Sequence, residues 1–516
     1  MKTCLALRSL ASLSLLPSLL SAAPGGGEPA LTVYGTGTPG SGGFVPTLWA
    51  NSTPRPGHAG FAWQLERGLG GSIGAGFVAP ARVDLPIAGL RILVDTSSAV
   101  ALPPLPLNGS GAGGGSLTVP LPLPNLSLLL GAELHGQVFV ADPAGAFVGV
   151  AATPGLTMRP KRPGMLVATR SVGGSPDAQV VIELATGTVR TFGGGAVDNG
   201  DGVTFTPRGT HLLVCGGLTR AVSVFDAATG PVPQHLFDMP SPAGTSPWNV
   251  HMHPDGRRAY VVNQGPSTTT PLVEVFDADP SSSNFGQPFP GGGFDPMSIS
   301  ALRMEFDPNG DSGYLANLGI GGTPGVFKYD TRTGSSTYHQ QVGALPLSGQ
   351  FVWDEVMSCD GSVLYLAAGP LGGNTEVNLV DPATMTRIDW DPGAPGVQNI
   401  GGEVSFGPTP TGRVINSLAV DPRHRYLYFA VAGGSFNPTM LVQVDVDPTS
   451  SNYRQSRTYT TGLPLGQLGG IALTDAGELL YLAVRDGSAV HEIDTATLTQ
   501  VRTFAVPSAP GFVALR

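Results

Sequence analysis

A short unit of strands recurs along the last two thirds of the chain, and this repeat restricts the possible folds more than any other feature. Each copy reads as an apolar strand, a tight turn, a strand with an aromatic residue, a loop, a strand ending in Asp, a second tight turn and a weaker strand. The clearest copy runs from Val250 to Asp277. Six complete copies have landmarks at residues 207, 254, 308, 359, 422 and 475, which are 47, 54, 51, 63 and 53 residues apart. This spacing is typical of β-propeller blades.

A seventh copy is divided between the two ends of the repeat region. Residues Met165–Thr169 match the second strand of the unit and Val180–Glu183 match the third. The missing first strand is found at the end of the chain, in Gly511–Arg516. A ring whose last strand completes its first blade has no open edge. The sequence therefore predicts a seven-bladed propeller over residues 165–516, closed by the strand 511–516.

The stretch Pro-Asp-Gly-Arg-Arg-Ala-Tyr-Val-Val-Asn, residues 254–263, resembles the repeat of the YVTN-type propellers. These belong with the YncE-like and lactonase-like seven-bladed proteins. The resemblance covers about two thirds of the chain. It implies the propeller fold, but the repeat residues are structural and do not identify an activity.

The residues before the propeller divide into three parts. Lys2 and Arg8, the apolar stretch 10–20 and the small residues 21–23 read as a signal peptide over 1–23, which predicts a secreted or cell-envelope protein. Residues 31–158 contain short apolar runs broken by Gly and Pro, which predicts a small all-β, sandwich-like domain. This region resembles glycine-rich β-modules at the front of secreted bacterial repeat proteins. Residues 159–164 read as a linker.

Composition limits the partners of the chain. Its 516 residues carry a net charge of −10, and no basic cluster suits nucleic acid. No later segment has the length and apolarity of a membrane helix. Cys215 and Cys359 are placed in different blades, so we expect no disulfide between them. The remaining expected partners are a small polar molecule or an extracellular protein or polysaccharide.

Polar residues gather on the predicted first strands of three successive blades. Because these strands line the central channel, their side chains form one polar sector. The candidate catalytic residues are His251, Arg303, Glu305 and Asp354, and the candidate ligand-binding residues are Trp248, Asn249 and Glu355. The corresponding positions in other blades hold small, uncharged residues: Gly202 and Thr204, Ser417 and Ala419, Gly470 and Ala472. The alternative interpretation is that the polar residues pair with one another and solvate a wet channel.

No cofactor or metal is predicted. His251 and His253 have a spacing that can hold a metal, but no third ligand is identifiable. Residues 307–311 begin like a calcium loop, yet Ser312 and Leu318 stand where such a loop needs Gly and Glu. Residues 198–202 are a second weak calcium candidate. Both acidic segments are better explained as turns.

Two functions follow from these observations. The absence of a catalytic motif favours a non-enzymatic secreted binding or scaffold protein that uses the channel mouth and the loop-rich face. That face holds the longer connections, which follow the second and fourth strands. The family resemblance supports a lactonase-like hydrolase of a small sugar lactone or related ester. In that alternative the carboxylates would activate water and Arg303 would hold an anionic substrate.

Overall fold

A computed structural model describes most of the chain from residue 30 onward. The described residues are 30–56, 58–124, 126, 129, 132–160, 164–170, 179–194, 202–206, 209–217, 219–241, 245–265, 272–296, 301–318, 323–370, 375–391, 400, 414–432, 439–464, 468–507 and 509–516. They fall into two compact units that meet in sequence between Arg162 and Pro163. The predicted signal peptide and residues 161–163 of the predicted linker lie outside the described residues.

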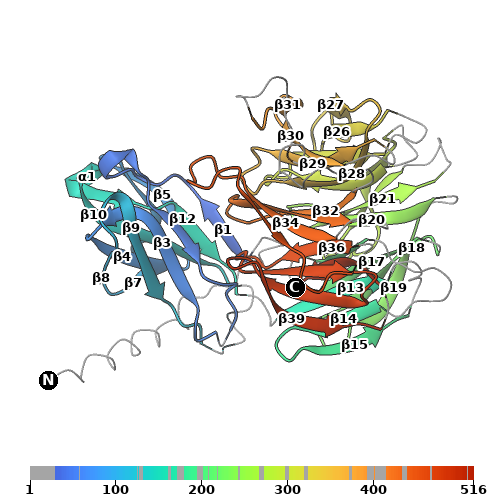
Figure 1. Cartoon of the computed structure of the whole chain (residues 1–516), viewed down its shortest axis with the longest axis horizontal. Coiled ribbons are helices and arrows are strands. Elements are labelled where there is room, and N and C mark those ends of the chain that lie inside the picture. The colour runs from blue at the N-terminus through green and yellow to red at the C-terminus, as the bar shows by residue number, and fades with distance from the viewer. Residues whose placement is uncertain are drawn as a thin grey trace. The chain divides into compact units, whose positions relative to one another are not determined.

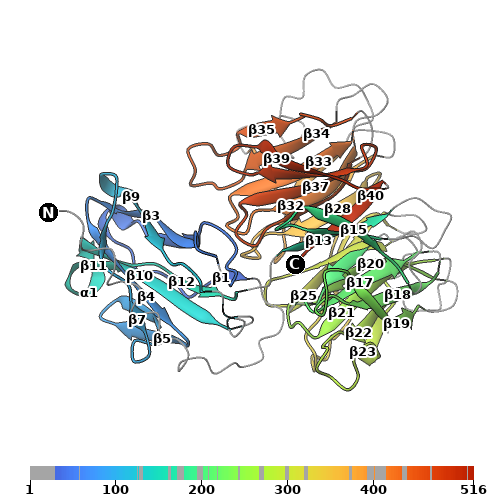
Figure 2. The same ribbon diagram turned by 90° about the horizontal axis from the view of Figure 1, so that it is seen from below.

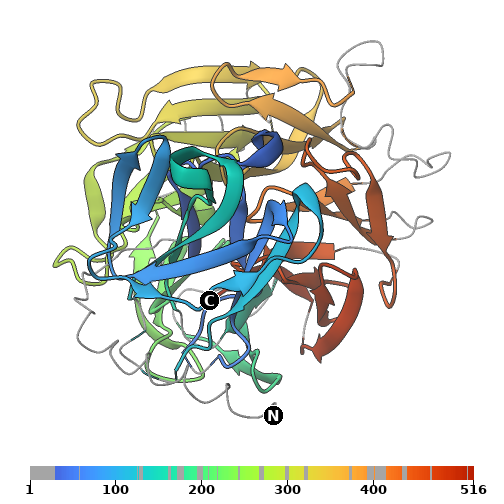
Figure 3. The same cartoon turned by 90° about the vertical axis from the view of Figure 1, so that its left-hand side faces the viewer.

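The first unit is a β-sandwich. Its larger sheet has the order β1-β12-β10-β4-β7, with β11 beside β10 and β8 beside β4. The strands of this sheet are β1 (Leu31–Tyr34), β4 (Ile73–Ala79), β7 (Val100–Ala101), β8 (Leu105–Pro106), β10 (Leu134–Gly145), β11 (Val150–Ala152) and β12 (Gly155–Met158). The smaller sheet consists of β2 (Thr47–Ala50), β3 (Ala62–Gly70) and β9 (Gly111–Pro120), and a hairpin of β5 (Arg82–Ile87) and β6 (Leu90–Val94) accompanies them. The one-turn elements η2 (Ser41–Gly43) and α1 (Ala146–Gly149) complete the unit, coloured blue to teal in Figures 1 and 3.

A buried tryptophan joins the two sheets of this sandwich. Trp63 on β3 is fully buried, and its indole Nε1 donates to the Met158 sulfur on β12 at 3.0 Å. Gly136 on β10 lies directly under the indole: a Cβ there would be 2.2 Å from the Trp63 ring. Glycine at this point therefore gives the large ring its place between the sheets.

The second unit contains seven four-stranded antiparallel sheets. The inner strands are β16 (Val203–Phe205), β20 (Ser246–Met252), β24 (Ala301–Phe306), β28 (Phe351–Met357), β32 (Val414–Val420), β36 (Leu468–Leu473) and β40 (Pro510–Leu515). The second strands are β17 (His211–Gly216), β21 (Arg258–Gln264), β25 (Ser312–Asn317), β29 (Leu364–Gly369), β33 (Tyr426–Ala432), β37 (Leu479–Val484) and β13 (Met165–Arg170). The third strands are β18 (Ala221–Asp226), β22 (Val273–Asp277), β26 (Gly325–Asp330), β30 (Glu376–Asp381), β34 (Met440–Asp445), β38 (Ala489–Asp494) and β14 (Gln179–Glu183). The outer strands are β19 (Gln234–Pro240), β23 (Pro288–Phe294), β27 (Gln341–Pro346), β31 (Thr386–Ile388), β35 (Ser456–Tyr459), β39 (Thr499–Ala505) and β15 (Thr188–Phe192).

The end of the chain closes the ring. Strand β40 pairs with β13, with Val167 opposite Ala514, so the last strand is the inner strand of the first blade. In Figures 1 and 2 the red end of the chain lies beside teal β13. Each inner strand contacts the next in cyclic order, and β40 contacts both β36 and β16. The predicted fold class, a seven-bladed propeller preceded by a sandwich, is confirmed.

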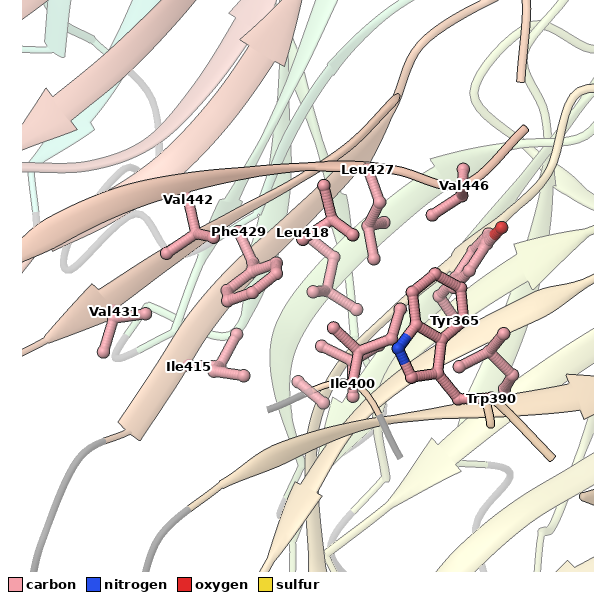
Figure 4. Close-up of a cluster of buried hydrophobic side chains, with 14 of the residues drawn as sticks. Tyr365, Trp390, Ile400, Ile415, Leu418, Leu427, Phe429, Val431, Val442 and Val446 are labelled. Atoms are coloured by element: carbon pink, nitrogen blue, oxygen red, sulfur yellow. The ribbon is translucent and has the colours of Figure 1, made fainter. Parts of the chain in front are cut away.

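Apolar side chains fill the spaces between neighbouring blades. Five second strands carry a tyrosine that is at most 2% exposed: Tyr260, Tyr314, Tyr365, Tyr428 and Tyr481. Figure 4 shows one such interface, in which Tyr365 and Trp390 of one blade pack against Ile415 and Phe429 of the next. Burial at these interfaces stabilises the ring, since the hydrophobic effect contributes roughly 25 cal/mol per Å².

The inner strands share an irregularity that the repeat analysis does not predict. Four of them have a β-bulge at the same register, and the bulged residues are Trp248, Leu302, Trp353 and Asn416. In β36 the ladder is also interrupted, between Leu468 and Ile471. A bulge re-aims the side chain that follows it. We call that next residue the post-bulge position.

No helix in the described part of the chain has both the length and the apolarity needed to cross a membrane.

Candidate functional site

Strand register defines which side chains are equivalent around the ring. The second-strand tyrosines pair with His251, Glu305, Val356, Ala419 and Ala472, which we call the tyrosine-paired position. The post-bulge position lies two residues earlier and holds Asn249, Arg303, Asp354 and Ser417. Because the post-bulge and tyrosine-paired positions are two residues apart on a strand, their side chains point to the same face of the blade.

An arginine forms the centre of the polar sector. Arg303 Nη1 on β24 lies 2.5 Å from Asp354 Oδ1 on β28, and Arg303 Nε lies 3.6 Å from Glu305 Oε1 on its own strand. The side chains of Arg303 and Glu305 are 24% and 22% exposed, whereas that of Asp354 is 2% exposed. The structure thus brings together three of the four predicted catalytic residues. Arg303 and Glu305 are the two that a ligand can still reach.

Asp354 also holds two blades together. Its Oδ2 accepts a hydrogen bond from the Leu418 backbone N–H on β32 at 2.6 Å. Ser417 repeats this contact one blade further on, where its Oγ accepts from the Ile471 N–H at 3.2 Å. The post-bulge side chain therefore satisfies a backbone donor of the following blade. One part of the role of Asp354 is structural.

Glu355, which the sequence places in the same polar sector as Glu305, does not occupy the equivalent strand position. It stands one residue before the tyrosine-paired position, where other inner strands carry Val250, Met304 and Leu418. Its side chain is fully buried, and Oε1 accepts from the Ala316 N–H of the preceding blade at 3.2 Å. Because the side chains of successive strand residues point to opposite faces, Glu355 lies on the other face of the blade from Asp354 and contacts the preceding blade. The prediction that it contacts a ligand is not supported by this position.

Burial controls the ionisation of the cluster. Burial raises the pKa of Glu305 to about 7, although the Arg303 charge opposes the shift. Burial also raises the pKa of Asp354, against the opposing Arg303 charge, and it holds the pKa of Glu355 well above the usual range of a carboxyl group. The proximity of Glu305 raises the pKa of Glu355 further. The cluster therefore binds protons at neutral pH more readily than solvent-exposed carboxylates do.

His251 occupies the tyrosine-paired position on β20, beside the arginine strand. Burial, and then the charge of Arg303, hold the pKa of His251 well below its ordinary value, so the ring is neutral at pH 7. Its Nε2 is buried and has no hydrogen-bond partner among the described residues. The same is true of Arg303 Nε and of Glu355 Oε2. Three buried polar atoms in one cluster without partners are unusual for a purely structural network.

The remaining sequence candidates lie at the edge of this cluster. Trp248 is the bulged residue of β20 and is half-buried. Asn249 Oδ1 accepts from the N–H of Val250, its own neighbour, at 2.9 Å. The Asn249 backbone packs against Gly202, where a Cβ would be 2.5 Å from the Asn249 Cα. These contacts of Asn249 are within the scaffold.

The metal candidates form no site among the described residues, where no group of three or more His, Cys, Asp or Glu side chains could hold an ion. His253 Nε2 instead hydrogen-bonds to the Gly310 carbonyl at 2.8 Å. Asp307 Oδ1 accepts from the Asp311 N–H at 2.8 Å, which is a turn contact. Four residues of the second calcium candidate, 198–201, lie outside the described part of the chain.

Two further groups, the buried Arg258 and the half-buried Glu274, were not predicted from the sequence. Arg258 is 3% exposed, and its Nε lies 2.6 Å from Asp255 Oδ2 while its Nη1 donates to the Thr331 carbonyl of the next blade at 2.7 Å. Glu274 accepts from Asn263 Nδ2 at 2.9 Å, and burial raises the pKa of Glu274 to about 7. The sequence contained a signal for Arg258, because this charged residue lies two positions before Tyr260 on the predicted second strand. Glu274 had no signal in the sequence.

Comparison with known proteins gives structural relatives only. No protein-family model matches the chain, and no curated protein matches it in sequence. Among solved structures, a 6-phosphogluconolactonase candidate from Bacteroides uniformis matches with a TM-score of 0.51 at 17% identity, over 68% of this chain and 99% of the other. The propeller has a lactonase-like fold. The periplasmic gluconolactonase of Pseudomonas aeruginosa also matches, with a TM-score of 0.51 at 16% identity over 68% of this chain and 98% of the other. At these identities the likeness shows the fold alone.

Proposed function

We propose that the propeller hydrolyses a small lactone or a related ester at the Arg303–Glu305 pair. One observation carries this proposal: a carboxyl group with a pKa of about 7 lies beside an arginine whose Nε–H has no hydrogen-bond partner. A general base works best when its pKa is close to the operating pH. The partial exposure of both side chains leaves them accessible to a ligand.

The chemistry requires only water and these side chains. The Glu305 carboxylate takes a proton from water while the water oxygen bonds to the carbonyl carbon of the lactone. The partly exposed Arg303 guanidinium donates to the oxyanion that develops on the carbonyl oxygen, where a preorganised donor stabilises the transition state. The ring C–O bond then breaks, and the Glu305 carboxylic acid returns its proton to the ring oxygen. The product is an open-chain hydroxy acid.

The surrounding residues position this pair. Asp354 holds the Arg303 guanidinium through Nη1 and is itself fixed by the Leu418 N–H. Two structural relatives with the same type of ring carry lactonase names, which supports the proposal by analogy of fold. We further propose, from residues 1–23, that the chain is exported; N-terminal sequencing of the protein from the culture medium or the periplasm would test this.

A binding protein without catalysis is the second candidate. It is favoured by the backbone contacts of Asp354 and Glu355, which give two of the carboxylates a role in blade packing. In that case the cluster would recognise a polar ligand at the axis, or the loop-rich face would contact an extracellular partner. The two candidates differ in whether the ligand is consumed.

The test is hydrolysis of a panel of aldonolactones and simple esters by the purified chain and by two variants. We expect Glu305→Gln to lower kcat by roughly 100- to 10,000-fold, which is the range for loss of a general base. The matched control is Glu183→Gln on β14, in the blade whose inner strand is β40; its rate should equal that of the wild type.

Thermal unfolding of both variants would show that they are folded. Loss of lactone hydrolysis in Glu305→Gln alone supports the proposal. Equal rates in Glu305→Gln and the wild type, or no turnover of any lactone or ester by the wild type, would contradict it. Ligand-induced stabilisation without turnover would identify the binding protein.

A further inference from the structure

We infer that the site selects uncharged lactones over anionic ones, phosphorylated lactones included. This inference rests on the proposed function and specifies its substrate class. It reverses the expectation from the sequence that Arg303 would hold an anionic substrate. The reason is the position of the guanidinium in the folded ring.

The positive charge of Arg303 is already neutralised within the cluster. Asp354 contacts Nη1 at 2.5 Å and Glu305 Oε1 lies 3.6 Å from Nε. A phosphate or carboxylate on the substrate would compete with these two carboxylates for the charge of the guanidinium, and Asp354 is held in place by the Leu418 N–H. The guanidinium can stabilise a charge that develops during the reaction, but its charge is already largely compensated in the ground state.

The net charge of the inner strands also disfavours an anionic ligand. Arg303 is the only Lys or Arg among the residues of the seven inner strands, which also contain Glu305, Asp354 and Glu355. One positive and three negative groups give a charge of −2 when all are ionised. Protonation of Glu305 and Glu355 would bring the cluster only to zero. His251 adds no charge, since its pKa lies well below the usual value.

The loop-rich face adds more negative charge. In the part of the chain that the structure describes, the connections after the second and fourth strands of the blades carry two arginines, Arg220 and Arg485, and no lysine or histidine. The same described segments carry four acidic residues, Asp295, Asp389, Asp391 and Asp486, so their net charge is 2 − 4 = −2, and Asp391 forms an ion pair with Arg454 at 2.7 Å. A ligand that approaches the axis from this face therefore meets a field that repels anions.

Repulsion of this kind has a measurable size. Two unit charges 5 Å apart interact by roughly 3 kcal/mol at an effective dielectric constant of about 20. A phosphate group positioned within 5–10 Å of these carboxylates should therefore lower kcat/KM by about 10- to 100-fold. The same repulsion is screened by salt, so the penalty should shrink at high ionic strength.

The experiment compares glucono-lactone with its 6-phosphate on the full-length wild-type protein. We expect kcat/KM for the uncharged lactone to be at least tenfold higher at low ionic strength, and the ratio to fall as sodium chloride is added. Asp354→Asn removes one negative charge and frees Arg303 Nη1, so it should narrow the ratio. The salt titration uses the wild type alone and keeps the test valid if this variant folds poorly.

The outcomes separate the inference from the proposed function. Hydrolysis of both lactones with the phosphorylated one preferred, or with a ratio that salt does not change, overturns the inference and leaves the hydrolase intact. No hydrolysis of either lactone, together with no turnover of the wider panel, overturns both.

Discussion

Two neighbouring inner strands of the propeller, β24 and β28, carry charged residues, whereas the next two, β32 and β36, do not. We call these two pairs the charged half and the neutral half of the comparison, and they share one backbone design. Strands β24 and β28 place Arg303, Glu305 and Asp354 beside the axis, whereas β32 and β36 place small or uncharged residues at the equivalent positions. Each of the four strands has an interrupted ladder at a similar register and faces a buried tyrosine on its second strand. The ring is therefore built equally well with and without the charges.

Ser417 shows what the scaffold requires at the post-bulge position. Its hydroxyl gives the Ile471 N–H the same acceptor that Asp354 gives the Leu418 N–H. A neutral oxygen is enough to satisfy the donor of the next blade. The scaffold therefore does not need a charged group at this position. The Asp354 carboxylate and the Arg303 guanidinium are both charged, and burying them costs desolvation energy. We attribute these charges to the proposed reaction.

The largest structural effect is expected from removing the arginine. Arg303→Met leaves the buried Asp354 carboxylate without its counter-ion, which typically costs about 3–5 kcal/mol. Urea unfolding followed by circular dichroism should show a lower midpoint for the propeller. Arg190→Met, at an exposed site on β15, is the control and should shift stability by less than about 0.5 kcal/mol. Equal urea midpoints for the two variants would show that Arg303 does not stabilise the fold through its ion pair with Asp354.

Stability should also depend on pH through the same cluster. Because burial raises the pKa of Glu305 to about 7, the folded state binds more protons than the unfolded state from about pH 4.5 upward. This contribution is complete below the unfolded pKa and is lost as pH rises through about 7, at up to about 1.4 kcal/mol per pH unit. Glu355 acts in the same direction. Urea midpoints at pH 5 and pH 7.5 should fall more steeply for the wild type than for Glu305→Gln, and parallel slopes would refute this.

A smaller effect is expected in the neutral half. Ser417→Ala leaves the Ile471 N–H without its acceptor, which should cost about 1 kcal/mol. Lactone hydrolysis should be unchanged, since Ser417 does not belong to the Arg303 cluster. If this variant loses activity while it remains folded, then the two halves are not functionally separate.

The smallest effect is expected at a tyrosine-paired position of the neutral half. Ala472 on β36 is equivalent to Thr204 on β16, so Ala472→Thr introduces a residue that the ring already accommodates. Its stability should lie within about 0.5 kcal/mol of the wild type. A large loss measured by thermal unfolding would mean that the neutral strands are packed more tightly than the comparison implies.

The sequence predicted the ring, but it gave the pairing of the charged residues only as an alternative interpretation and did not identify the partners. Repeated strands and the split seventh copy are properties of the chain order, so β40 could be assigned to the first blade before the structure was known. The bulges are a property of hydrogen-bond register, which the repeat does not show. For this reason Glu355 was grouped with Glu305, although counting back from Tyr365 would have placed it one residue earlier, at the blade interface. The engagement of Arg303 by Asp354 depends on a contact between neighbouring blades, which the sequence does not show. For this reason the sequence favoured an anion site at Arg303, whereas the structure does not.

The most direct test of the account is the pH dependence of hydrolysis of an uncharged lactone, measured for the wild type against Glu305→Gln as the background. With Glu305 as the base, kcat should rise with pH to a plateau, with a midpoint near 7, and the rise should be absent from the variant. A midpoint near 4.5, which is the ordinary value for a glutamate, or the same profile in both proteins, would show that Glu305 does not carry the reaction.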